Sequence, residues 1–132
     1  MVADLVTVVI PVYRAEKYLA ETLRSLEAQT YPHFEVVLVD DGSTDQSLTI
    51  CQDFSRRDDR FRIVSQQNSG PSAARNNGVA NARGEYLVFL DSDDIMAPHA
   101  LESMVQAMKE EQADLVLGMY ARFFDHQDPF TC

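Results

Sequence analysis

The chain has 132 residues, with 21 acidic side chains against 11 basic ones and a net charge of −10. This is the length of a single domain, and it can bury a core without disulfides or a structural metal. A surface this acidic should repel nucleic acid and anionic lipid, and no apolar run is long enough to cross a bilayer. The two cysteines, Cys51 and Cys132, do not suggest a disulfide framework, so reduced thiols and a cytoplasmic location are expected.

Strand and helix patterns alternate along the chain. Runs of β-branched and apolar residues predict strands at 5–10, 34–39, 60–65, 86–90 and 114–120, with 60–65 the more peripheral. Helical periodicity appears between them at 15–29, around Leu48, Cys51 and Phe54, at 72–83 and after Pro98. This order predicts an α/β fold in which a mostly parallel, Rossmann-like sheet carries helices on both faces. The small residues of 72–83 predict a helix that approaches the sheet or a ligand closely.

An acidic stretch follows the strand predicted at 86–90. Its apolar residues predict burial on both faces, and Asp91, Asp93 and Asp94 follow at the carboxyl end, where parallel sheets bind ligands. Asp91 and Asp93 are two residues apart and would point the same way along a strand. Carboxylates this close repel unless a cation lies between them, and Mg²⁺ or Mn²⁺ prefers such ligands. We therefore expect a metal–diphosphate site, with a solvated acidic turn that caps the next helix as the alternative.

Three segments should meet at this edge, because each follows a parallel strand: 11–14, 40–43 and 91–94, with the loop 69–75 within reach. Together they could hold a nucleotide. A base can stack on Tyr13 or pack against Pro11, and a carboxylate can accept an imide N–H or a ribose hydroxyl. Arg75 can pair with phosphate in bidentate fashion. The alternative for Tyr13 is an ordinary surface tyrosine.

Several segments, in their order and spacing, resemble the family 2 glycosyltransferases of GT-A fold. These segments are 8–13 (VVIPVY), 25–32 (SLEAQTYP), 39–45 (VDDGSTD), 70–78 (GPSAARNNG), 84–86 (GEY) and 89–94 (FLDSDD). The resemblance runs from about Val6 to Tyr120. Arg14 departs from it, since the family commonly has Asn at that position.

The resemblance implies an inverting, metal-dependent enzyme of the hexosyltransferase type. It would transfer a sugar from a nucleotide-diphosphate donor, most often a UDP-sugar, to a glycan, a lipid-linked acceptor or another hydroxyl, as in polysaccharide and cell-envelope biosynthesis. It places Pro11 and Tyr13 at the base, Asp41 with Asp40 at the uracil or ribose, and Arg75 near the nucleotide. Asp91 and Asp93 would form the Asp-x-Asp motif, with Asp91 also at the nucleotide and Asp93 the direct ligand of Mn²⁺ or Mg²⁺. Asp94 would lie beside the donor sugar or the metal.

The resemblance also divides the chain. Residues 1–120 would form the donor-binding domain and 121–132 the start of an acceptor-side region. The family's catalytic base lies beyond the Asp-x-Asp strand, and neither Asp125 nor Asp128 has a matching context. We therefore expect a truncated chain that is weakly active or inactive alone, and that forms a homodimer through apolar surface at the cut edge. A peripheral location at the inner face of the membrane is a second expectation for the full-length protein.

Two other classes of protein share some of these sequence features. A non-catalytic nucleotide- and metal-binding module of the same fold stays open, because the motif residues serve binding as well as catalysis. A phosphorelay receiver domain is disfavoured, because it needs a lysine after a late strand and no lysine follows Leu117 in the strand predicted at 114–120.

Overall fold

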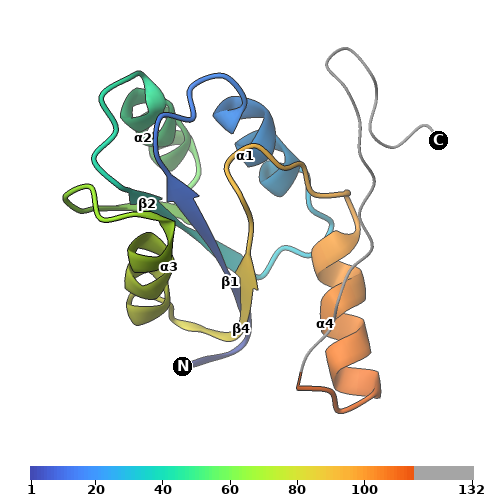
Figure 1. Ribbon diagram of the computed structural model, residues 1–132. Helices are drawn as coiled ribbons and strands as arrows, with labels where there is room; N and C mark the ends of the chain where they lie inside the picture. Colours follow the sequence, from blue (N-terminus) through green and yellow to red (C-terminus); the bar gives the residue numbers. More distant parts are fainter. Residues whose placement is uncertain (115–132) are drawn as a thin grey trace.

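The computed structural model describes residues 1–114, so the strand predicted at 114–120, beyond its first residue, and the segment 121–132 lie outside the described residues. Four strands alternate with four helices in this part of the chain (Figure 1): β1 (Val2–Val12), α1 (Leu19–Glu27), β2 (Phe34–Asp40), α2 (Ser47–Arg57), β3 (Phe61–Ser65), α3 (Pro71–Ala80), β4 (Gly84–Phe89) and α4 (Ala100–Glu110). All the strand pairs are parallel, and the order is β3-β2-β1-β4. The predicted α/β fold is confirmed.

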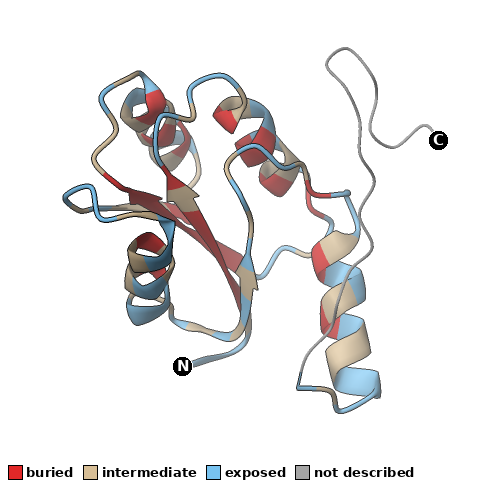
Figure 2. Cartoon of the chain, viewed as in Figure 1, coloured by how far each residue is buried: buried red, intermediate tan, exposed pale blue. Residues whose placement is uncertain are grey.

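The core lies on both faces of the two inner strands. Along β1, alternate side chains point to opposite faces, so Val8 and Ile10 join the large core formed with α1, α2 and α4. Val9 points the other way and packs with Val37, Val39 and Ala74 beneath α3. Figure 2 shows the buried residues concentrated on these strands and on the helix surfaces that face them.

Helix α3 approaches the sheet closely, as its small residues predict. A Cβ atom at Gly78 would lie 2.2 Å from Cγ1 of Val9, a separation that no side chain can adopt without movement. Glycine at this position therefore lets α3 lie directly on β1 and β2.

The prediction that residues 86–90 are buried on both faces is wrong. Strand β4 is an edge strand of the described sheet, and its residues alternate between partly buried and exposed. Leu87 and Phe89 are 43% and 49% exposed, because α3 packs mainly against β1 and β2 and leaves their face of β4 open. A short apolar run does not by itself distinguish an edge strand from a central one.

Candidate functional site

The loops that follow β1, β2 and β4 lie at the same edge of the sheet, as expected (Figure 1). The Asp41 N–H donates to the Val12 carbonyl (2.8 Å), and the Leu90 N–H donates to the Val9 carbonyl (3.1 Å), so pairing with β1 continues to the start of each loop. The first two loops are also joined directly, since the Ala15 N–H donates to Oγ of Ser47 (2.7 Å). These hydrogen bonds tie the start of each loop to β1 and join the loops after β1 and β2 to each other.

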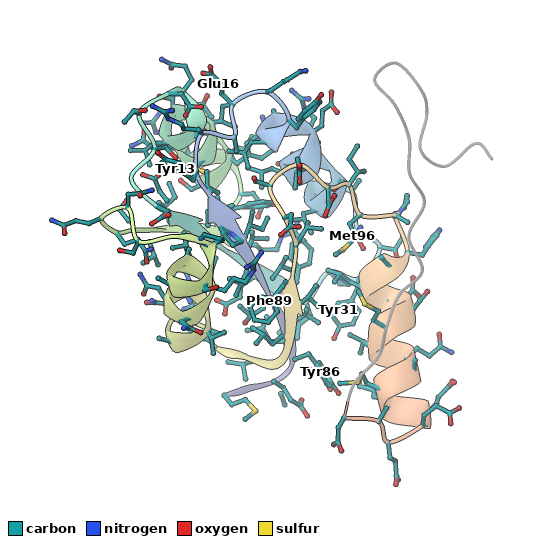
Figure 3. The ribbon with its side chains drawn as sticks, in the orientation of Figure 1. Tyr13, Glu16, Tyr31, Tyr86, Phe89 and Met96 are labelled. Atoms are coloured by element: carbon teal, nitrogen blue, oxygen red, sulfur yellow. The ribbon has the colours of Figure 1, made fainter. Side chains whose placement is uncertain are left out.

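Tyr13 directly follows β1 (Figure 3), and the residue is 47% exposed. The next residue, Arg14, has a φ of 48°, which turns the chain sharply, and its guanidinium lies 5.8 Å from the centre of the Tyr13 ring. Nε of Arg14 donates to Oγ1 of Thr44 in the loop after β2 (3.2 Å). Pro11 pairs in register with Val39 of β2, just below the tyrosine. An exposed aromatic ring therefore stands where a planar ligand can stack on it.

Asp41 is buried, at 3% exposure, and organises the loop 66–70. Its Oδ1 accepts hydrogen bonds from Gln66 Nε2 and the Ser69 N–H, both at 2.8 Å, and its Oδ2 accepts from the Gly70 N–H (3.0 Å) and Asn68 Nδ2 (3.3 Å). Burial raises the pKa of Asp41, but these hydrogen bonds outweigh it, so the pKa lies below its ordinary value. The carboxylate is therefore ionised and held by four donors at neutral pH.

Asp40 is also buried, at 5% exposure, and stabilises the turn after β2. Its Oδ1 accepts a hydrogen bond from the Ser43 N–H (3.2 Å) across Gly42, whose φ of 74° favours glycine. A Cβ at Gly42 would lie 3.1 Å from the backbone nitrogen of Asn68, so this turn also packs closely against the loop 66–70.

The acidic stretch after β4 forms an exposed cluster. Oxygens of Asp91, Asp93 and Asp94 all lie within 4.8 Å of one another. Strand alternation is not the cause, because β4 ends at Phe89 and the chain then turns, with the Asp94 N–H donating to the Asp91 carbonyl (3.1 Å). Partial burial raises the pKa of Asp94, and the negative charges of Asp93 and Asp91 raise it further. No donor among residues 1–114 pairs with the carboxylates of Asp93 and Asp94, so these groups are available to a cation.

Arg75 reaches this cluster from α3. Its Nη2 lies 3.2 Å from Oδ1 of Asp91, and both side chains are partly exposed, at 38% and 59%. A pair this exposed contributes at most about 1 kcal/mol to stability, so either partner can be released to a ligand without a large cost.

The polar side of α1 holds the segment between the acidic cluster and α4, and sequence reasoning missed this role. The residues that do so are Thr22 and Ser25 of α1 and, just after the helix, Gln29 and Thr30; they contact Ser92, Met96, Ala97 and Glu102. Thr22, Ser25 and Gln29 are spaced by three and four residues, which continues a helical surface beside the apolar stripe of Leu19, Leu23 and Leu26. The sequence signal that could have revealed this role is the set of polar residues at helical spacing next to an apolar stripe.

The donor set fits a hard divalent cation. The cluster offers carboxylate oxygens with no nitrogen or sulfur ligand, and it is exposed enough to leave coordination positions for water or phosphate. Burial raises the pKa of Asp94, and the negative charges of Asp93 and Asp91, which raise it further, are charges that such a cation would offset.

Comparison with known proteins defines the class. The family model described as "Glycosyl transferase family 2" matches residues 7–131, and the chain belongs to this family. The glycosyltransferase GlyG of Streptococcus pneumoniae is 41% identical over 129 residues, which is 97% of this chain and 43% of that protein.

Solved structures agree with the family assignment. The crystal structure of residues 1–349 of Staphylococcus aureus TarS with UDP-GlcNAc matches 83% of this chain and 32% of that chain, at 37% identity and a TM-score of 0.79. The mannosyltransferase PcManGT of Pyrobaculum calidifontis, in complex with GDP-Man and Mn²⁺, matches 79% and 31%, at 28% identity and a TM-score of 0.66. The fold is thus of GT-A type. The chain spans less than half the length of each of these proteins, and none of its described helices is long and apolar enough to span a membrane.

Proposed function

We propose that this chain carries the donor-binding half of an inverting, metal-dependent glycosyltransferase that uses a nucleotide-diphosphate sugar, with UDP as the preferred nucleotide. The observation that carries the proposal is the cluster of Asp91, Asp93 and Asp94, gathered within 4.8 Å at the same edge of the sheet as the exposed Tyr13 ring and Arg75. Two proteins with the same fold were crystallised with nucleotide sugars, one of them with Mn²⁺, which supports the donor class and the metal.

Mn²⁺ or Mg²⁺ bound at the cluster would neutralise charge on the donor's diphosphate and on the leaving nucleotide. Asp93 and Asp91 would hold the ion, and Asp94 would lie on the side of the donor sugar. Arg75 is paired with Asp91 in the free protein, and release of this exposed pair would present its guanidinium to a phosphate.

The nucleoside would lie over the β1 and β2 loops, with its base against Tyr13 and Pro11 and its base edge or ribose towards Asp40 and Asp41. The packing of Asp41 sets a condition on this part of the proposal. Because its oxygens already accept four hydrogen bonds, a direct contact requires a ligand N–H or O–H to replace a side-chain donor, that of Gln66 or Asn68. Without such an exchange, Asp41 acts on the nucleotide through the loop that it orders.

We further propose that residues 1–120 act as the donor-binding domain and that 121–132 begin an acceptor-side region. Inverting transfer needs a base that deprotonates the acceptor hydroxyl, and we assign that base to no residue of this chain. The 132-residue chain should therefore bind donor nucleotide and metal but transfer sugar weakly or not at all. Efficient transfer by this chain alone would contradict this division.

Calorimetric titration of UDP, in Mn²⁺ and separately in EDTA, tests the proposal. We expect binding in Mn²⁺ and much weaker binding in EDTA, and Asp93→Ala should remove the effect of the metal. GDP, titrated in the same way, tests the nucleotide preference.

Asp53→Ala is the matched control, because Asp53 is an exposed acid on α2 whose side chain is 59% exposed, as is that of Asp91. UDP binding that is equally strong in Mn²⁺ and in EDTA would contradict a metal site at the cluster. So would a metal effect that is lost as much in Asp53→Ala as in Asp93→Ala.

A further inference from the structure

The acidic turn is anchored by a buried hydroxyl beneath it. Oγ1 of Thr22 on α1 donates a hydrogen bond to the carbonyl of Ser92 (2.9 Å), the residue between Asp91 and Asp93. Thr22 is fully buried, at 0% exposure, and Ser92 is partly buried, so water replaces this donor only in part if it is lost. A partly buried contact thus holds the middle of a turn whose three acids are all exposed.

This contact acts on the geometry of the cluster. The Ser92 carbonyl shares a planar peptide unit with the Asp93 N–H, so holding its oxygen fixes the plane from which Asp93 departs. Three like charges within 4.8 Å favour spreading of the turn in the absence of a cation. The Thr22 hydrogen bond opposes that spreading from below, while the Asp94-to-Asp91 backbone bond closes the turn from within.

The other polar contacts of α1 act further along the chain. The Met96 N–H donates to Oγ of Ser25 (3.1 Å), and Oγ1 of Thr30 donates to Oε2 of Glu102 in α4 (2.6 Å). Figure 3 shows Met96 between the turn and α4, away from Phe89 at the end of β4. Only Thr22, within the polar surface of α1, contacts the acidic turn itself among the described residues.

We propose that Thr22 is a positioning residue for the metal–diphosphate site: its hydroxyl holds the Ser92 carbonyl so that the carboxylates of Asp91 and Asp93 converge on one cation. This inference rests on the proposed function. Thr22 touches neither donor nor metal and acts only through the backbone of the turn.

The test compares Thr22→Val with Thr22→Ser. Valine keeps the shape of threonine but removes the donor, whereas serine keeps the donor and loses a methyl group. Mn²⁺ affinity is measured with UDP present, by the electron paramagnetic resonance signal of free Mn²⁺ and by calorimetry. Loss of a group that orients a metal ligand weakens metal binding by about 10–100-fold, so we expect a loss of at least about tenfold in Thr22→Val and recovery to within about twofold in Thr22→Ser.

Thr30→Val is the matched control, because it removes the same atom near the end of α1 and breaks a contact to α4, not to the turn. It should bind Mn²⁺ within about twofold of the wild type. Melting temperatures show that each variant is folded at the assay temperature. If Thr22→Val is not, Thr22→Cys replaces it, since a thiol is a weak donor of similar size, and it should bind Mn²⁺ more weakly than Thr22→Ser.

The outcomes separate the two proposals. Wild-type protein that binds no Mn²⁺ with UDP overturns the proposed function and this inference together. Wild-type binding with an unaffected Thr22→Val overturns this inference alone, as does Thr22→Ser that is as weak as Thr22→Val, because packing and not the hydroxyl would then matter.

Discussion

The two ends of the parallel sheet both carry acidic side chains, and they use them in opposite ways. At the amino end, Glu35 of β2 is buried, at 4% exposure, and every oxygen has a donor. Its Oε2 accepts from Thr7 Oγ1 (2.6 Å) and the Arg83 N–H (2.7 Å), and its Oε1 accepts from Arg83 Nε (3.0 Å) and Arg62 Nε (3.3 Å). At the carboxyl end, the cluster of Asp91, Asp93 and Asp94 is exposed and has one basic partner among the described residues, Arg75.

The difference teaches how to separate a structural carboxylate from a ligand-binding one. Glu35 joins β1, β2, β3 and the start of β4, and Gly84 completes the network by donating its N–H to Oγ1 of Thr7 (2.9 Å). A carboxylate whose oxygens all have donors can contact a ligand only by giving up one of them. The cluster has three carboxylates and too few donors, so its electrostatic energy falls when a cation binds.

The largest expected effect is on stability, at the amino end. Glu35→Ala removes the acceptor for four donors and leaves buried donors unpaired, so we expect the free energy of unfolding to fall by about 3 kcal/mol in urea denaturation. Nucleotide binding per folded molecule should not change. A loss of less than about 1 kcal/mol would show that the network at Glu35 is not structural.

Stability at the amino end should also depend on pH through Glu35, and this effect is smaller than that of Glu35→Ala. Burial raises the pKa of Glu35, but its hydrogen bonds from Thr7, Arg83 and Arg62 outweigh it and lower the pKa below its ordinary value of 4.5. A lowered folded pKa stabilises the protein above pH 4.5, and this stabilisation is lost as the pH falls towards the folded pKa.

Glu35→Gln keeps the shape of the side chain but does not titrate. The free energies of unfolding of the wild type and this variant, from urea denaturation, should therefore differ by about 1–2 kcal/mol at pH 7 and converge below pH 4.5. A difference that stays constant down to pH 3 would mean that the charge of Glu35 makes no contribution.

Arg75 tests the carboxyl end, where one change should have effects of opposite sign. Arg75→Ala removes a cation beside Asp91, so binding of Mn²⁺ alone should strengthen. The same change removes a proposed phosphate ligand, so binding of UDP in saturating Mn²⁺ should weaken by about tenfold. Calorimetry measures both. If the two affinities move in the same direction, Arg75 is not shared between Asp91 and the ligand.

The comparison also shows what the sequence alone reveals. Strand and helix order followed from periodicity, and the meeting of the loops followed from the rule that parallel strands end at one edge. The exposure of Leu87 and Phe89 did not, because it depends on where α3 lies across the sheet. The same holds for Glu35, whose partners Thr7, Arg62 and Arg83 come from three distant segments.

Within the site, residue types were predictable but their partners were not. A turn, and not strand alternation, brings Asp91 and Asp93 together, and it adds Asp94 to the cluster. The saturated hydrogen bonding of Asp41 depends on the fold of the loop 66–70, which no periodicity describes. Local patterns predicted which groups reach the edge, whereas long-range packing decides which of them are already engaged.

The smallest expected effect is on stability at Asp94. There, the effect of Asp94→Asn on the free energy of unfolding should change sign when Mn²⁺ is added. Without metal, Asp94→Asn removes one of three repelling charges, so the free energy of unfolding in EDTA should rise by about 0.3 kcal/mol, the scale of an exposed like-charge pair. Asp53→Asn is the control, because Asp53 lies beside Arg56 (3.7 Å) and should give no gain.

In saturating Mn²⁺, the wild type should become more stable than Asp94→Asn, which reverses the order of stability expected in EDTA. A cation that binds only the folded state stabilises the wild type in proportion to the logarithm of its concentration over the dissociation constant. Asp94→Asn offers a weaker site and should gain less. Urea midpoints of both proteins in EDTA and in Mn²⁺ decide this. If the same protein is the more stable one in both conditions, metal does not relieve the repulsion within the cluster. The carboxylates at the two ends of the sheet would then differ in exposure, but those of the cluster would not be distinguished as metal ligands.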